Sequence, residues 1–219
     1  VLMATETDEG HGAETQSPYD RWIRSRLQAT IGAVRDGFAS YRFDLAAQAA
    51  YEFTWYEFCD WYLEFSKTIM QSNESTAEQR RGTRRTLIET LETLLRLLHP
   101  LMPFITEEIW QRVAPRAGIA AQSIMRQPYP STAPEAMQPA IEAEVRWVMD
   151  FILGVRRIRG ELDIAPSLQL SPRLQGASAP ELERVTVVLC RIRHRERALG
   201  VLAREHRLHA VIAQGEAVR

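Results

Sequence analysis

The sequence has little cysteine, almost no lysine and no long apolar run. Two cysteines, Cys59 and Cys190, are too few for a disulfide scaffold and are typical of a reducing compartment. No apolar stretch approaches the roughly 20 residues that cross a bilayer. The acidic residues that follow Val1-Leu2-Met3 do not fit a secretion signal. We therefore expect a cytoplasmic protein with no membrane partner.

The charges nearly cancel, since 27 cationic residues face 28 acidic ones. This balance excludes a globally basic nucleic-acid binder, and we expect no DNA partner. Lys67 is the only lysine, so the other 26 cations are arginine, the residue suited to bidentate phosphate contacts. A GC-rich genome explains the same bias. The arginines are nevertheless uneven: residues 20–42 and 80–96 each hold five against two acids, and residues 156–207 hold eleven against six.

Apolar periodicity predicts a mainly α fold, a helical bundle followed by a small α/β appendage. Asp20 is predicted to cap a first helix, with a buried stripe at Ile23, Leu27 and Ile31. Asp44 is predicted to cap a second helix that ends near Thr68. Further helices are expected from Ser75 or Thr76 to the residues before Pro100, from Pro103 to Val113, and over residues 140–159, with an extended crossing at 114–139. On the buried faces we place Leu87, Leu91, Leu94, Leu98, Ile105, Ile109 and Val113.

The second predicted helix is unusually aromatic. Residues 51–65 hold eight of the 18 aromatic side chains. A helix that is apolar on almost every face is typical of a position surrounded by other helices. We therefore expect it to be the central helix of the bundle.

Composition also suggests three segments. Residues 1–17 are acidic and polar, and we expect a flexible linker there. Residues 18–165 hold the predicted bundle. Residues 166–219 are expected to form the small α/β subdomain, with strand-like alternation at Leu168 and Leu170 and again at 208–212, and with a helix at 180–199.

No pattern in the sequence indicates a catalytic centre. There is no phosphate-binding glycine loop, no Gly-x-Ser-x-Gly elbow and no cysteine–histidine cluster for zinc. Cys59, among aromatics, is interpreted as a core thiol, and His99 as a residue that packs or caps a helix end. We expect no catalytic residue, metal or cofactor in these 219 residues.

Three motifs resemble those of a known family. EFCDWYLEFSK (Glu57–Lys67), preceded by Trp55, resembles the signature of the anticodon-binding domain of valyl-tRNA synthetases, which are class I aminoacyl-tRNA synthetases. LLHPLMPFITEEIW (Leu97–Trp110) resembles a helix–proline–helix turn that the valine, isoleucine and leucine enzymes share. VRRIRGELDIAPS (Val155–Ser167) resembles the stretch after the bundle in bacterial valine enzymes, and DRWIRSRL (Asp20–Leu27) its first helix.

The resemblance implies a role in tRNA recognition. The chain would be the C-terminal anticodon-binding region of a bacterial synthetase, cut before the family's coiled-coil arm. It would hold the anticodon stem-loop of a valine tRNA beside the catalytic domain of the same polypeptide. The whole enzyme would use ATP to ligate valine to that tRNA, whereas this piece alone would be inactive. The motifs themselves are apolar enough that we expect most of their residues in the core.

For the RNA-binding face we choose the first helix and the start of the third. Trp22 lies outside the Ile23–Leu27–Ile31 stripe, so we expect it to stack on an anticodon base. The residues expected to contact phosphate are Arg21, Arg24 and Arg26, with Arg84 and Arg85 as second choices. Each of these arginines could instead form a surface ion pair.

Two alternatives remain open at this point. The chain could be the equivalent domain of an isoleucyl or leucyl enzyme, although Glu57–Lys67 argues against that. It could also be a helical protein-interaction module that does not bind RNA.

Overall fold

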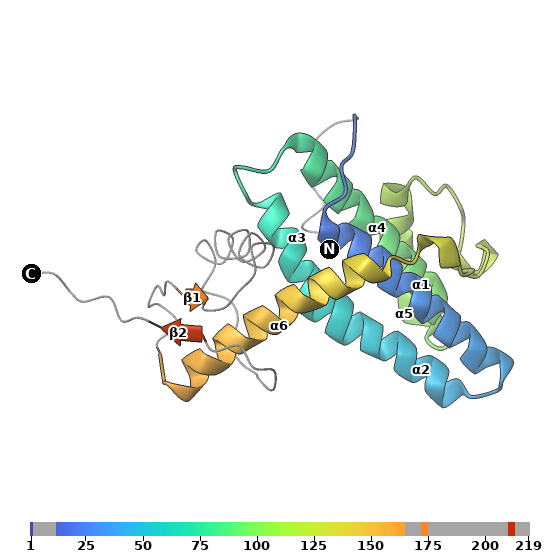
Figure 1. Cartoon of the computed structure of the whole chain (residues 1–219). Helices are drawn as coiled ribbons and strands as arrows, with labels where there is room; N and C mark the ends of the chain where they lie inside the picture. Colours follow the sequence, from blue (N-terminus) through green and yellow to red (C-terminus); the bar gives the residue numbers. More distant parts are fainter. Residues whose placement is uncertain (2–11, 165–171, 175–209, 213–219) are drawn as a thin grey trace, which may run out of the picture. The chain divides into compact units, whose positions relative to one another are not determined.

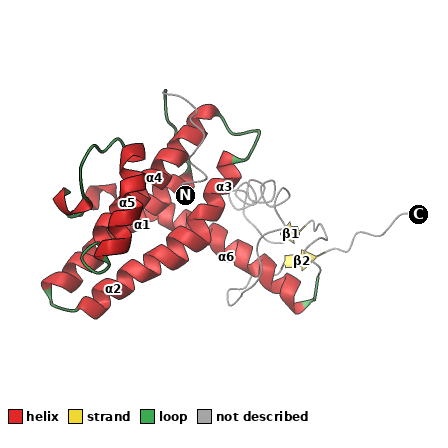
Figure 2. Cartoon of the chain, turned by 180° about the vertical axis from the view of Figure 1, so that it is seen from behind, coloured by secondary structure: helices red, strands yellow, loops and turns green. Residues whose placement is uncertain are grey.

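The computed structural model describes residues 1, 12–164, 172–174 and 210–212 (Figure 1). The chain divides between Glu142 and Ala143 into two compact units, and this division falls inside one helix. The described residues are mainly helical, as predicted (Figure 2). No helix among them is both long and apolar enough to cross a membrane.

Helix α1 spans Pro18–Ala39 and begins with a capping box. Ser17, not Asp20, is the N-cap: its hydroxyl accepts from the Asp20 amide at 3.1 Å. The Asp20 carboxylate in turn accepts from the Ser17 amide at 2.8 Å. Asp20 was thus wrongly predicted as the cap because it occupies the acidic third position of the same motif.

The predicted aromatic helix is one continuous segment of three parts: α2 (Phe43–Glu52), the π-helical η2 (Phe53–Tyr62) and α3 (Leu63–Met70). We call residues 43–70 the aromatic segment. Asp44 does not cap it, since its carboxylate pairs with Arg42 at 2.7 Å. The prediction that other helices surround it is also wrong: Tyr51, Trp55 and Tyr56 are exposed.

Helices α4 (Ala77–Leu98) and α5 (Pro103–Val113) form the predicted helix–proline–helix turn. Thr76 caps α4 with Gln79 as its capping-box partner, and Pro103 opens α5. The buried face of α5 is displaced by one residue from the predicted one. Ile105 is exposed, whereas Thr106 and Trp110 are buried with Val113.

Side-chain contacts fix the directions of the helices in the first unit. α1 and α4 run the same way, because Asp20 meets Thr83 and Arg24 meets Glu89. The aromatic segment runs opposite to α1, with Tyr62 against Asp20 and Ala46 against Gly37. The largest fully buried apolar side chains of this unit are Ile23, Ile31, Val34, Phe53, Tyr62, Leu87, Leu97, Trp110 and Val113.

The remaining described parts are simpler. Residues 114–138 cross the surface as predicted, with short 3₁₀ turns at Ala114–Ala117 (η3), Ile124–Arg126 (η4) and Pro134–Ala136 (η5). Helix α6 (Pro139–Glu161) begins in the first unit and continues into the second. There the strands β1 (Pro172–Leu174) and β2 (Ala210–Ile212) pair antiparallel, with Arg173 opposite Val211.

The predicted α/β subdomain is described only in part. Ala210–Ile212 confirms the end of the alternation predicted at 208–212. Leu168, Leu170 and the helix predicted at 180–199 lie outside the described residues. The domain limits at 17 and 165 therefore stay predictions.

Candidate RNA-binding surface

The structure places the sequence-predicted RNA contacts at one end of the first unit. α1 and α4 are parallel and begin side by side, so residues from both starts converge there. The Thr83 hydroxyl on α4 donates to Asp20 on α1 at 2.9 Å. Farther along, Arg24 of α1 and Arg85 of α4 share the carboxylate of Glu89. We call this region, the first three turns of each helix, the arginine end.

Trp22 is not available for base stacking. Its side chain is only 4% exposed and meets the ring of Phe65 edge-on, with the ring centroids 6.3 Å apart. Tyr19, one turn earlier, stacks on the same Phe65 ring, with the ring centroids 4.2 Å apart. The prediction was wrong because α1 has two apolar faces. The i, i+3 pair Tyr19 and Trp22 is the sequence signal for the second face, which packs on α3.

Arg26 is part of the bundle rather than a free phosphate contact. Its guanidinium makes two hydrogen bonds of 2.8 Å to Glu57 and one of 3.3 Å to Glu142. The hydrogen bond to Glu57 raises the pKa of Arg26 above its usual range, although partial burial opposes this. Such a bidentate pair holds α1 to the aromatic segment, so its main role is structural.

Arg21 and Arg24 are also engaged. The Nε of Arg21 donates to Gln138 at 2.9 Å, and Arg24 contacts Thr86 and Glu89. A guanidinium has five N–H donors, so a phosphate could still be added to either group. The ion pair that the sequence left as an alternative is therefore what the structure contains for Arg24.

Of the two predicted contacts on α4, Arg85 is exposed and Arg84 is half-buried. Arg85 pairs with Glu89 at 2.6 Å and with Glu14 at 3.4 Å. Its hydrogen bond to Glu89 raises the pKa of Arg85, which remains cationic at neutral pH. Exposed ion pairs of this kind contribute only about 0–1 kcal/mol, so a phosphate could replace the acid without a large loss.

The linker predicted at residues 1–17 is held to this end over its described part. The guanidinium of Arg81 donates to the Ala13 carbonyl at 2.9 and 3.1 Å, and the Thr15 amide donates to the Glu78 carbonyl at 3.1 Å. Gly82 permits this approach, since an added Cβ would lie 2.3 Å from the Thr15 carbonyl oxygen. The arginine end therefore comprises the starts of α1 and α4 and residues 13–15.

The motifs that carry the family resemblance supply only part of the core. The prediction that most of their residues are buried is wrong, since Trp55, Met102, Phe104 and Ile105 are exposed. Within Glu57–Lys67, Glu57 pairs with Arg26 and Tyr62 donates to Asp20. The ring of Phe65 packs against Tyr19 and Trp22. Side chains of the first-helix motif and of the aromatic motif therefore contact each other directly. Burial, together with the neighbouring Asp20 carboxylate, raises the pKa of Tyr62 well above its usual value.

The helix–proline–helix motif is organised around buried polar contacts. The indole Nε1 of Trp110 donates to Glu92 at 2.9 Å, and Arg96 makes a bidentate pair with the same carboxylate. His99 ends α4 and its Nδ1 lies 2.7 Å from the Thr106 hydroxyl. The interpretation of His99 as a capping and packing residue is confirmed.

Sequence reasoning missed the exposed aromatic side chains. Tyr41 and Phe43 at the α1–α2 turn are exposed, as is Phe104 at the start of α5. The spacing of Tyr51 and Trp55, four residues apart and stacked with an interplanar angle of 4°, could have indicated one outward-facing side of the aromatic segment.

Groups suited to a metal or to covalent chemistry are not found together in the described part of the chain, where no set of three His, Cys, Asp or Glu side chains could hold a metal. Cys59 is half-buried, and burial raises the pKa of its thiol, so a thiolate is disfavoured there.

Comparison with known proteins identifies the family of this chain. The profile of the family described as "Anticodon-binding domain of tRNA ligase" matches residues 20–174. The chain is also similar to proteins named valine–tRNA ligase from the Paris and Philadelphia 1 strains of Legionella pneumophila, with 47% identity over 186 residues. The same identity is found with the Lens strain protein. This match covers 84% of the chain but 20% of each relative.

The family profile covers the described bundle from Asp20 onward, including Glu57–Lys67 and Leu97–Trp110. The chain therefore belongs to the family of anticodon-binding domains of tRNA ligases.

Proposed function

We propose that this chain is the anticodon-recognition domain of a valine–tRNA ligase and that it holds the anticodon stem-loop of a valine tRNA. The observation that carries the proposal is the 47% identity to the Legionella valine enzymes across 84% of the chain. The equivalent domain of an isoleucyl or leucyl enzyme is less well supported, because the motif Glu57–Lys67 resembles the valine signature.

Since the chain spans about a fifth of the length of these relatives, the proposal includes a longer polypeptide. Its catalytic domain would use ATP to activate valine and would charge the tRNA that this domain selects. We propose that it acts in the cytoplasm, and that residues 1–219 supply binding but no catalytic group.

The arginine end is the proposed RNA surface. It offers Arg85 and Arg24 at the surface, each held by an acid that a phosphate could replace. With Trp22 buried, phosphate contacts from α1 and α4 are the predicted contacts that remain accessible. Such contacts position an RNA loop and weaken steeply with salt.

The test is fluorescence anisotropy of the chain with a labelled valine tRNA transcript and with the same transcript carrying another anticodon. We expect tighter binding to the valine anticodon at moderate salt. Equal affinity for both transcripts would contradict anticodon recognition.

Single arginine variants then test the surface. Arg85→Ala should weaken binding to both transcripts and lower the slope of log Kd against log salt concentration by about one. Arg112→Ala is the matched control, because Arg112 is also exposed and paired with an acid, Glu108, but lies on α5. Equal effects of the two substitutions would place the RNA elsewhere.

A further inference from the structure

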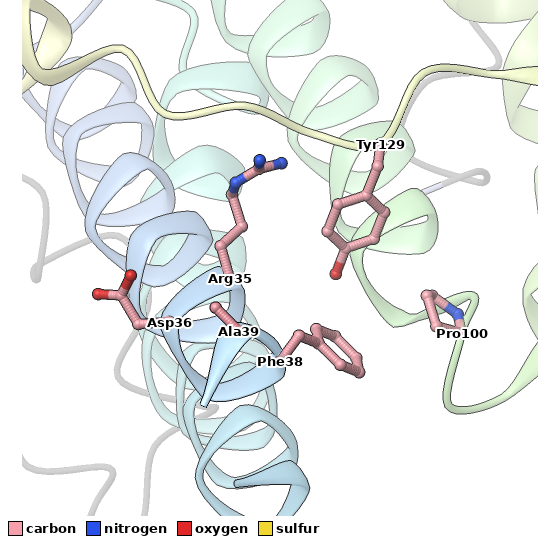
Figure 3. A pocket seen from close by; sticks show the side chains of 6 residues that line it. All are labelled: Arg35, Asp36, Phe38, Ala39, Pro100 and Tyr129. Atoms are coloured by element: carbon pink, nitrogen blue, oxygen red, sulfur yellow. The ribbon is translucent and has the colours of Figure 1, made fainter. Parts of the chain in front are cut away.

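The end of the first unit opposite the arginine end has a different character. There the C-terminal turn of α1 and the α4–α5 turn meet around a hollow of about 510 Å³. Figure 3 shows its lining residues: Arg35, Asp36, Phe38, Ala39, Pro100 and Tyr129. The hydroxyl of Tyr129 donates to the Leu97 carbonyl at 3.0 Å, which holds its ring against the end of α4.

Aromatic rings continue from this hollow to the surface. Phe38 meets Tyr129 edge-on at 6.2 Å and lies 5.8 Å from Phe43, which is 6.3 Å from Tyr41. Tyr41 is 82% exposed, and Phe104, four residues after Pro100, is 90% exposed. Met102 and Ile105 beside Phe104 are exposed as well. We call Phe38, Tyr41, Phe43, Pro100, Met102, Phe104, Ile105 and Tyr129 the aromatic end.

The backbone of the α1–α2 turn holds Tyr41 in an unusual conformation. Its φ is 57°, in the left-handed region that a bulky aromatic residue rarely adopts. Such a conformation costs about 1–3 kcal/mol and persists only where the surroundings determine it. Here the Tyr41 amide donates to Phe38 and the Arg42 amide to Gly37, at 3.2 and 2.8 Å, so the turn is well defined. These two hydrogen bonds form a Schellman cap, so the end of α1 accounts for the conformation of Tyr41.

The charges at this end do not favour RNA. Arg42 is neutralised by Asp44 at 2.7 Å, and this pairing lowers the pKa of Asp44 to about 2. Arg35 donates to the Pro130 carbonyl at 3.0 Å and has Asp36 beside it. The two cations and two carboxylates cancel, so the attraction for phosphate that the arginine end offers is missing here. Exposed apolar side chains around a neutral hollow are typical of a protein interface.

We propose that the aromatic end docks onto the catalytic part of the same synthetase polypeptide, with an apolar side chain of that part entering the hollow. This inference rests on the proposed function, because about four-fifths of the length of each relative lies outside the part that matches this chain. The two ends then have separate partners. The arginine end takes tRNA, and the aromatic end fixes the domain to the enzyme that charges it.

Amide hydrogen exchange tests the proposal. One sample is the 219-residue chain, and the other is the Legionella enzyme with its matching segment replaced by that of this chain. The first-turn amides of α5 lack intrahelical acceptors, so they exchange fast unless something covers them. We expect exchange at residues 41–45, 104 and 105 to be at least ~10-fold slower in the long chain without tRNA.

Substitutions in the long chain identify the surface. Phe104→Asp should remove the protection at residues 41–45, although Phe104 is distant from them in sequence. Met125→Asp is the control, because Met125 is 78% exposed on η4 and lies outside the aromatic end. In the 219-residue chain neither substitution should shift the unfolding midpoint, which excludes misfolding as the cause.

Three results would overturn the inference. Equal exchange in the two samples would mean that no protein covers this end. Protection that appears only after valine tRNA is added would assign the surface to RNA. Protection of the 219-residue chain that grows with its concentration would assign it to a second copy. Anticodon discrimination is measured separately by anisotropy. If the chain did not discriminate between anticodons, the proposed function would fail, but the exchange data would still test whether a protein covers the aromatic end.

Discussion

The hydroxyl of Tyr62 donates to the Oδ1 atom of Asp20 at 2.7 Å, and both residues are completely buried. The other carboxylate oxygen accepts from the Ser17 amide at 2.8 Å and from the Thr83 hydroxyl at 2.9 Å. One carboxylate therefore joins the start of α1, the aromatic segment and α4. Because it lies below the arginine end, it also fixes the positions of the helices that carry Arg24 and Arg85.

Removal of this contact should destabilise the bundle. Tyr62→Phe leaves Asp20 with two donors and should lower the free energy of unfolding by about 1–3 kcal/mol. Asp20→Ala should cost more, because it leaves the buried hydroxyls of Tyr62 and Thr83 without their acceptor. Urea unfolding measures both. Tyr41→Phe, at an exposed tyrosine, should have almost no effect, and a loss equal to that of Tyr62→Phe would refute the assignment.

The same pair predicts how stability depends on alkaline pH. Burial raises the pKa of Tyr62 in the folded state, whereas an unfolded tyrosine titrates near pH 10. The unfolded chain therefore binds fewer protons above about pH 10, so the contribution of Tyr62 is complete below that pH and declines above it. One such group gives a slope of up to about 1.4 kcal/mol per pH unit.

Urea unfolding between pH 8 and 11 checks this expectation. The Tyr62→Phe variant should lose less stability over that range than the unmodified chain. Some decline should remain, because burial also raises the pKa of Tyr129. Parallel stability curves for the two proteins would show that Tyr62 does not keep its proton in the folded state.

Much of the bundle could be predicted from local signals. Thr76 and Pro103 mark helix starts by well-defined chemistry: Pro103 was identified correctly, and Thr76 was one of two candidates with Ser75. The exposure of Trp22 and the central position of the aromatic segment were predicted wrongly, because the periodicity of a single helix does not say how many neighbours that helix has. Ion pairs between distant residues, such as Arg26 with Glu57, depend on the packing of α1 against η2. The sequence could therefore indicate an arginine-rich surface but not which arginines are accessible on it.

Two glycines of α1 should respond in opposite ways to the same substitution. A Cβ at Gly37 would lie 2.9 Å from both the Cβ and the amide nitrogen of Ala46, where α1 meets α2. Gly37→Ala should therefore cost about 1–3 kcal/mol through overpacking. A Cβ at Gly32 would meet only the Thr132 methyl group at 3.5 Å, an ordinary contact. Gly32→Ala should stabilise the helix by about 0.5–1 kcal/mol.

Thermal unfolding of the two variants distinguishes these effects. If both raised the unfolding midpoint, the close approach of α1 and α2 would not exist in solution. If both lowered it, residues 130–133 would pack more tightly on α1 than the structure indicates.

Loss of the arginine partner should destabilise the protein more at the buried carboxylate of Glu92 than at the exposed carboxylate of Glu108, although both form i, i+4 ion pairs. Glu92 accepts from Arg96 and from the indole of Trp110, whereas the pair Glu108 and Arg112 is exposed. Arg96→Ala leaves a buried charge with a single partner and should cost about 3–5 kcal/mol. Arg112→Ala should cost at most about 1 kcal/mol. Similar losses in urea unfolding would mean that Glu92 is hydrated in the folded protein.

Variants of Trp22 distinguish a role of this residue in stability from a role in RNA recognition. Because its indole is buried against Phe65, Trp22→Ala should lower the free energy of unfolding by about 3–5 kcal/mol through the cavity that it leaves. Trp22→Phe keeps a ring in the same site and should lose less. Where the Phe variant is fully folded, its preference between the two tRNA transcripts should match that of the unmodified chain, since the ring does not reach the surface. Lost anticodon preference in a folded Trp22→Phe protein would instead show that the indole turns outward on binding, as the sequence alone predicts.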